Sequence, residues 1–351
     1  MGRPSSADAG RDVDRRRFLG LLAAGAAGLT AAACTTSAGS TRAASSARAS
    51  GPGPSPGAAS APARATTSST AAVPASTAAL PRTTPWTARI GEVHPAVKHR
   101  ATALVQAVAA WPEGQGGMAA ARRRVAALGM DPSLADACAP LVGSEPAAAC
   151  QVVDAQYGGI LATSSSVLVV VDQWRRHADG TVHAGGTTLD IRLVEASPRW
   201  RVVDVFPAHP APATRTPASN ARAVLSSSRI HLPHAAHADV MSGTIHASVL
   251  DTLLALADRY VVDVSIVRSG HPYYVFGTRR RSDHPRGRAV DVWALDGRPL
   301  VEPVNHPLAV AGMRLAVAHG AYNVGGPVLL AGAQYFSDQT HQDHIHLGFD
   351  V

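Results

Sequence analysis

The deciding stretch of this chain reads Ser282-Asp283-His284-Pro285-Arg286-Gly287-Arg288-Ala289-Val290-Asp291, and about fifty residues later comes His341-Gln342-Asp343-His344-Ile345-His346. A helix would not continue through Pro285 and Gly287, so His284 and Asp291 cannot be two turns of one helix despite their seven-residue spacing. We expect a loop histidine that folds back over an aspartate on a β-strand.

Both parts of this stretch predict strands with polar side chains on one face. Successive side chains of a strand point to opposite faces, so Ala289 and Asp291 share a face, and so do His344 and His346. Ile345 then points into the core. The small side chain of Ala289 leaves room beside the aspartate for a bound ion.

Histidine and aspartate without cysteine favour a catalytic zinc site over a structural one. Two neutral imidazoles and one carboxylate would leave Zn²⁺ with a net charge of +1 and a vacant fourth position for water. The pKa of such a water falls to about 7, so it can act as a nucleophile at neutral pH.

The pattern Ser-x-His-x-x-Gly-x-Ala-x-Asp, with a distant His-x-His, resembles the zinc D-alanyl-D-alanine carboxypeptidases and related peptidoglycan endopeptidases. This superfamily is shared with the Hedgehog signalling domain, and the resemblance covers about ninety residues. It implies that His284, Asp291 and His346 bind Zn²⁺. It also implies that Asp343 is the general base and that His344 stabilises the oxyanion or relays the proton.

The chain departs from this family at one position. Many relatives carry an arginine shortly after a Ser-Gly pair, whereas Ser269-Gly270 is followed here by His271-Pro272. Arg268 or an arginine of the run 279–281, such as Arg280, could instead form a bidentate pair with a substrate carboxylate. Together with Ser282, these are the predicted substrate-binding residues.

The N-terminus predicts export. Residues 1–34 contain a twin-arginine-like string and a short apolar run that ends in Ala31-Ala32-Ala33-Cys34, which resembles a lipobox. Acylation of Cys34 would anchor the protein to the outer face of the cytoplasmic membrane, and simple cleavage of the leader is the alternative. Residues 35–87, rich in Ser, Thr, Ala and Pro, predict a disordered tether.

Two folded domains of α+β class are expected beyond the tether. In residues 88–210, apolar residues at spacings of three and four from Val97 predict a helix. Alternating strands follow, as around Ile191, and the order resembles NTF2-like or cystatin-like folds by pattern only. This domain shows no catalytic constellation and is interpreted as a binding or spacing module. Residues 220–351 form the zinc metallopeptidase-like domain.

Cysteine usage and charge add two expectations. Cys138 and Cys150 are close enough in sequence to form a disulfide in an oxidising compartment, with two buried free thiols as the alternative. The formal charge of +7 comes almost entirely from arginine, because Lys98 is the only lysine. The charge is dispersed and no nucleic-acid motif is evident, so we expect no nucleic-acid partner.

These features predict an exported zinc peptidase of the cell envelope that cuts the peptide stems of peptidoglycan, as a D,D-carboxypeptidase or an endopeptidase. The alternative is a non-catalytic, zinc-stabilised binding module. A third possibility is that the first domain binds a lipid or a partner protein and the zinc domain is a passenger.

Overall fold

The computed structural model describes residues 78–350. The predicted leader with Cys34, and the tether up to residue 77, lie outside the described residues. Among the described helices, none combines the length and the apolar character needed to cross a membrane.

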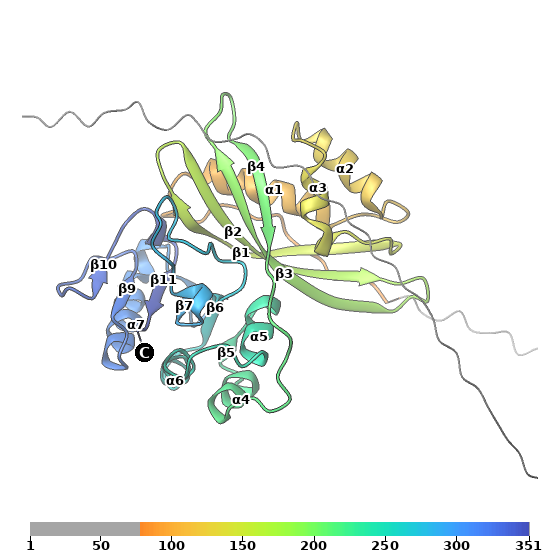
Figure 1. Ribbon diagram of the computed structural model, residues 1–351. Helices are drawn as coiled ribbons and strands as arrows, with labels where there is room; N and C mark the ends of the chain where they lie inside the picture. Colours follow the sequence, from red (N-terminus) through yellow and green to blue (C-terminus); the bar gives the residue numbers. More distant parts are fainter. Residues whose placement is uncertain (1–77, 351) are drawn as a thin grey trace, which may run out of the picture. The chain divides into compact units, whose positions relative to one another are not determined.

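The N-terminal half, residues 78–210, is an antiparallel sheet with helices on one face (Figure 1). The four strands pair in sequence order and are joined by short turns. The main elements are α1 (Pro95–Ala109), α2 (Met118–Ala127), α3 (Leu134–Ala137), β1 (Ala147–Ile160), β2 (Ser164–Arg176), β3 (Val182–Val194) and β4 (Arg201–Pro207).

Strand β2 is buried on both faces, which explains its continuous apolar run. Val167, Val169 and Val171 point into the core under the helices. Leu168 and Val170 point the other way and pack against Ile266 of the C-terminal half. Alternation along one strand therefore provides apolar surface to both halves of the protein.

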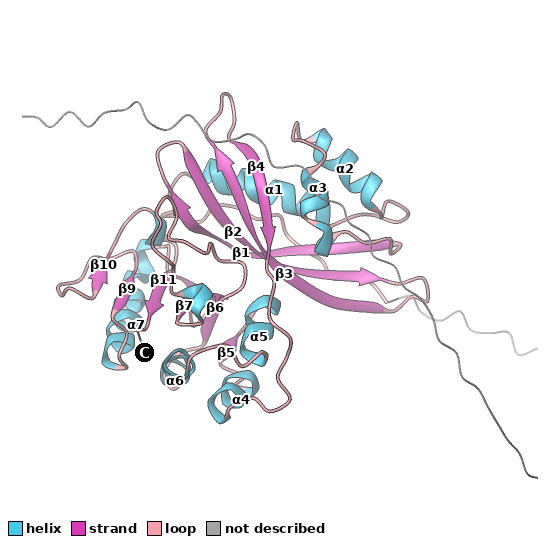
Figure 2. Ribbon diagram, in the orientation of Figure 1, coloured by secondary structure: helices cyan, strands magenta, loops and turns pink. Residues whose placement is uncertain are grey.

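The C-terminal half, residues 219–350, is a mixed sheet with flanking helices (Figure 2). The sheet order is β10-β9-β11-β7-β6-β5, with β8 paired to β7. Its helices are α4 (Ser219–Ser226), α5 (His234–Met241), α6 (Ala247–Ala257) and α7 (His306–Ala318). Its strands are β5 (Ile230–His231), β6 (Val262–Ile266), β7 (Ala289–Leu295), β8 (Arg298–Pro299), β9 (Asn323–Gly325), β10 (Tyr335–Phe336) and β11 (Ile345–Gly348).

The structure confirms the predicted α+β class. The sequence pattern did not predict β1, because its alanines, glycines and polar residues lack the alternation of a typical strand. The tether also ends earlier than predicted. Residues 78–87, which the sequence assigned to the tether, belong to the N-terminal half: Trp86 joins its core and the main-chain N–H of Thr84 donates to Oε1 of Gln151.

The predicted disulfide is absent from the structure. Cys138 and Cys150 are free thiols within the N-terminal core. Burial raises the pKa of both thiols to about 12, so they remain protonated and pack as small apolar side chains.

Candidate metal centre

Neighbouring strands bring two of the predicted ligands together. β7 and β11 are antiparallel, and in their register His346 lies opposite Asp291. The Nδ1 atom of His346 is 3.0 Å from Oδ1 of Asp291. The third predicted ligand, His284, begins the short 3-10 helix η2 (His284–Arg286), and its Nε2 lies 3.1 Å from each of those atoms. Three distant positions thus present their donor atoms to one point.

A glycine allows the loop to reach this point. Gly287 follows η2 with a φ of +68°, a left-handed conformation that favours glycine. A Cβ at this position would lie 2.1 Å from the main-chain oxygen of Thr244, because the loop packs tightly on the segment before α6. The backbone conformation and the close packing therefore explain why the sequence pattern has glycine at position 287.

The protonation of His284 follows from its second hydrogen bond. Nδ1 of His284 lies 2.8 Å from the main-chain oxygen of Val267, which can only accept. Nδ1 therefore carries the proton, and the lone pair of Nε2 faces Asp291. Such a hydrogen bond on the far ring nitrogen is the usual way in which a metal-binding histidine is oriented.

The charges around the three donors also suit a cation. Burial by itself raises the pKa of Asp291, but His284 and His344 hold it well below its usual range, so the carboxylate is ionised. Burial lowers the pKa of His346 to about 4, which leaves this imidazole neutral. A neutral imidazole and a carboxylate are the protonation states that metal binding requires.

These residues can hold a metal ion. Ligands at about 2.0–2.1 Å from a tetrahedral zinc ion would lie about 3.3 Å from one another, close to the 3.0–3.1 Å separations here. Moreover, when the His284 ring is neutral, its Nε2 and Oδ1 of Asp291 are both acceptors and face each other inside the protein. Such a pair needs a proton or a cation between them.

His271 is an additional candidate ligand that the sequence pattern missed. It presents a ring nitrogen within 4.8 Å of the donor atoms of His284 and Asp291, and its ring stacks on that of His284 at a centroid distance of 4.1 Å. Asp239 fixes the loop, because its carboxylate accepts from the main-chain N–H of Ser269 at 2.6 Å. The one signal in the sequence is that His271 follows Ser269-Gly270, close to where the family that this chain resembles carries an arginine.

His344 lies beside the three donor atoms. Its Nε2 faces them, and its Nδ1 faces Asp343. Its Nε2 is 3.7 Å from Oδ1 of Asp291, and its Nδ1 is 2.5 Å from Oδ1 of Asp343. Burial lowers the pKa of His344, but Asp291 and Asp343 outweigh this effect and raise it to about 9. His344 is therefore held by Asp343 and directed at the metal centre.

The predicted role of Asp343 as the general base does not fit this geometry. Its Oδ2 is 2.7 Å from Nζ of Lys98 and accepts from the main-chain N–H of Tyr157 at 3.0 Å, while Oδ1 is taken by His344. Burial raises the pKa of Asp343, but Lys98 and His344 lower it to about 2. Both oxygens are thus engaged, and the carboxylate positions His344 instead of reaching the cavity.

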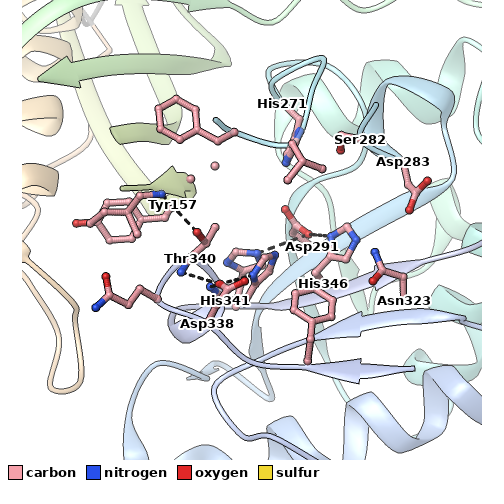
Figure 3. A pocket seen from close by; sticks show the side chains of 18 of the residues that line it. Tyr157, His271, Ser282, Asp283, Asp291, Asn323, Asp338, Thr340, His341 and His346 are labelled. Atoms are coloured by element: carbon pink, nitrogen blue, oxygen red, sulfur yellow. Dashed lines mark hydrogen bonds and ion pairs between the residues drawn. The ribbon is translucent and has the colours of Figure 1, made fainter. Parts of the chain in front are cut away.

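The metal centre opens into a cavity of about 480 Å³ (Figure 3). Its walls come from the end of β1, from the loop 271–283 and from the segment 336–346. Ser282 and Arg280, two of the three predicted substrate-binding residues, line it. Arg268 does not, because its side chain lines a separate hollow beside Phe206. His341, whose Nδ1 is 2.8 Å from Asp338, also lines the cavity and was not assigned a role from the sequence.

Buried charges extend from Asp343 into the N-terminal half. Lys98 is fully buried and bonded to both Glu92 and Asp343. One lysine cannot neutralise two carboxylates, and the remaining negative charge is costly at this depth. Burial, opposed by Lys98, raises the pKa of Glu92 from 4.5 to about 7.

Glu92→Gln is expected to remove a pH dependence of stability. A carboxyl whose pKa is raised on folding stabilises the fold below pH 4.5, and this contribution is lost as the pH rises towards 7. The free energy of unfolding of the parent should therefore fall by up to about 3 kcal/mol over this range relative to the variant. Urea titrations at several pH values would measure it, with Glu113→Gln as the control because Glu113 is an exposed carboxylate. Parallel pH profiles of the parent and Glu92→Gln would contradict it.

Comparisons of the chain with protein-family models, with curated proteins and with solved structures found no match. The assignment of function therefore depends on the geometry of the metal centre and on the motif that predicted it.

Proposed function

We propose that this protein is a zinc-dependent peptidase that hydrolyses the peptide stems of peptidoglycan. The observation that carries the proposal is the convergence of His284, Asp291 and His346, with donor atoms 3.0–3.1 Å apart, at a cavity that His344 also lines. A metal centre open to a cavity suits catalysis better than a closed structural site.

The chain supplies the ligands and a proton-transfer group. Zn²⁺, when bound by His284, Asp291 and His346, would supply Lewis-acid polarisation of a carbonyl and activation of a water molecule. His344, which is protonated because its pKa is raised to about 9, would give the proton of Nε2, the nitrogen that faces the centre, to the leaving group and take one back from the activated water. Asp343 would hold the proton of His344 at Nδ1 and fix the ring orientation, as the carboxylate of a catalytic triad does.

The cavity suits a short peptide that carries a carboxylate. Its volume is about 480 Å³, and its walls combine the aromatic rings of Phe276 and Phe336 with polar groups. Arg280 lies at the wall, where a guanidinium could pair with a terminal or side-chain carboxylate of a stem peptide. A carboxypeptidase would bind a free terminus there, whereas an endopeptidase would bind a branched or continuing chain.

The wider expectations belong to the same proposal. We take the N-terminal half as an NTF2-like or cystatin-like domain and the C-terminal half as a Hedgehog/D,D-peptidase-like domain, on the sequence pattern and on the element order. We also propose export, a lipid anchor at Cys34 and a location at the cell envelope, on the sequence pattern of the leader alone. They are consistent with a peptidoglycan substrate.

One observation favours the alternative, a non-catalytic zinc-stabilised binding module. His271 could supply a fourth protein ligand, because one of its ring nitrogens lies within 4.8 Å of the donor atoms of His284 and Asp291. Four protein ligands around zinc are typical of a structural site. Zinc binding without hydrolysis would support this alternative.

Metal-dependent hydrolysis of stem peptides tests the proposal. The mature chain should contain about one zinc ion and cleave a pentapeptide stem that ends in D-alanyl-D-alanine, followed by mass spectrometry. Removal of the metal with a chelator should abolish cleavage, and added Zn²⁺ should restore it. Release of D-alanine would indicate a carboxypeptidase and cleavage of cross-linked dimers an endopeptidase, whereas a zinc-loaded chain that cleaves neither would refute the proposed activity.

A further inference from the structure

A strand of the N-terminal half reaches directly into the metal centre. Nε2 of Gln156, on β1, donates to Oδ2 of Asp291 at 2.7 Å, and the residues are 135 positions apart in sequence. Gln156 is fully buried. The other oxygen of Asp291, Oδ1, is the one that faces His284 and His346. The amide of Gln156 thus fixes which carboxylate oxygen points at the metal position.

The orientation of this amide is determined by a second contact. The hydroxyl of Ser265, on β6, donates to Oε1 of Gln156. Since a hydroxyl donor meets the amide oxygen and an ionised carboxylate can only accept, the NH₂ group must be the one that faces Asp291. Ser265, Gln156 and Asp291 form a buried chain of hydrogen bonds across the two halves.

An irregularity in β1 directs Gln156 towards this chain. The register with β2 shifts between Val152 and Asp154. Val152 points into the N-terminal core before the shift, whereas Ala155 and Tyr157 do so after it. Without the shift, strict alternation would have turned Gln156 into that core with Val152. β-Bulges commonly redirect a side chain beside a functional site.

The same part of β1 also supports His344. The main-chain N–H of Tyr157 donates to Asp343, and Lys98 of α1 pairs with the same carboxylate. Residues 157–161 then form one wall of the cavity. The N-terminal half therefore contacts a predicted ligand, the group that orients His344, and the substrate space.

We propose that the N-terminal half is an integral part of the metal centre, with Gln156 as the positioning residue for the ligand Asp291. This inference rests on the metal-binding part of the proposed function, and it replaces the interpretation of residues 88–210 as a separate binding or spacing module. Hydrogen-bond partners of metal ligands orient the ligands, and their loss typically lowers metal affinity about 10–100-fold.

Gln156→Met in the full mature chain tests the proposal, because methionine keeps the length of the side chain and removes the donor. The affinity for Zn²⁺ is measured by competition with a chromogenic chelator, and the melting temperature of the metal-free protein is measured separately. The matched control is Gln173→Met, since Gln173 is a buried glutamine on β2 that donates to main-chain oxygens of Ala109 and Leu141, away from the centre.

The proposal predicts that Gln156→Met lowers zinc affinity about 10–100-fold while Gln173→Met leaves it near the parent value. An affinity equal to that of the control would overturn it. If Gln156→Met does not fold, Ser265→Ala tests the proposal instead. This smaller substitution removes the hydroxyl that holds the amide of Gln156, so it should lower zinc affinity severalfold. Unchanged affinity in that variant would also overturn the proposal.

These outcomes separate the inference from the peptidase activity. Loss of zinc affinity in a protein that cleaves no peptide would leave the inference standing and remove the proposed activity. Peptide cleavage by the parent, with unchanged zinc affinity in Gln156→Met, would support the proposed activity and overturn the inference. A parent chain that binds no divalent metal would overturn both.

Discussion

Asp291→Ala is expected to lower the affinity for Zn²⁺ at least about a hundredfold and to abolish metal-dependent hydrolysis. The variant removes the only charged donor among the three, the carboxylate oxygen that lies 3.1 Å from Nε2 of His284 and 3.0 Å from Nδ1 of His346. Apparent binding free energies of zinc sites are about 10–16 kcal/mol, so one of three or four ligands accounts for about 3–5 kcal/mol. Zinc content after dialysis and chelator competition would measure the loss.

The control for Asp291→Ala is an aspartate of the neighbouring strand. Asp263 on β6 pairs with His231 at 2.8 Å, so Asp263→Ala also breaks a histidine–carboxylate contact of the same sheet. It should leave zinc affinity unchanged, because neither residue belongs to the ligand cluster. A zinc affinity of Asp291→Ala equal to that of the parent would remove this carboxylate from the metal centre.

Lys98→Met is expected to lower the free energy of unfolding by about 3–5 kcal/mol, because it leaves buried carboxylates without their cation. Lys98 is fully buried, bonds to Glu92 and Asp343, and holds the pKa of Asp343 below its usual range. Asp343 would then lose a contact that fixes its position beside His344. We therefore expect the turnover number of the proposed hydrolysis to fall as well, with little change in zinc content.

Arg122→Met provides the matched control for Lys98→Met. Arg122 pairs with Asp136 at 2.7 Å, but both side chains are about half exposed. Exposed pairs contribute at most about 1 kcal/mol, so this variant should unfold close to the parent in urea. Equal unfolding free energies for the two variants would show that the buried network around Lys98 does not stabilise the fold.

Local patterns predicted much of the fold. The period of three and four residues after Val97 corresponds to α1, and the alternation around Ile191 corresponds to β3. These signals are local, because the spacing of apolar side chains follows from the geometry of one helix or one strand. Strand β1 has no such signal, since a register shift between Val152 and Asp154 breaks its alternation and Gln156 contacts Asp291 instead of an apolar core.

The residues of the candidate site were likewise predicted only in part. The sequence alone identified His284, Asp291 and His346, because residue type and spacing on a loop and two strands are sufficient to suggest a ligand set. It did not identify His271, and it assigned Asp343 a direct role that the contacts with Lys98 and Tyr157 do not favour. The position of His271 depends on how Asp239 folds the preceding loop, which no local pattern reveals.

By itself the sequence determined the donor atoms, the α+β class and the faces of β7 and β11, because these depend on side-chain chemistry and on the period of a strand. Only the tertiary structure decided the register that places His346 opposite Asp291, and the partners that Lys98 and Gln156 find in the other half. The reason is physical: a buried charge or amide is satisfied by whichever group the packing brings within hydrogen-bond distance, and that group is distant in sequence.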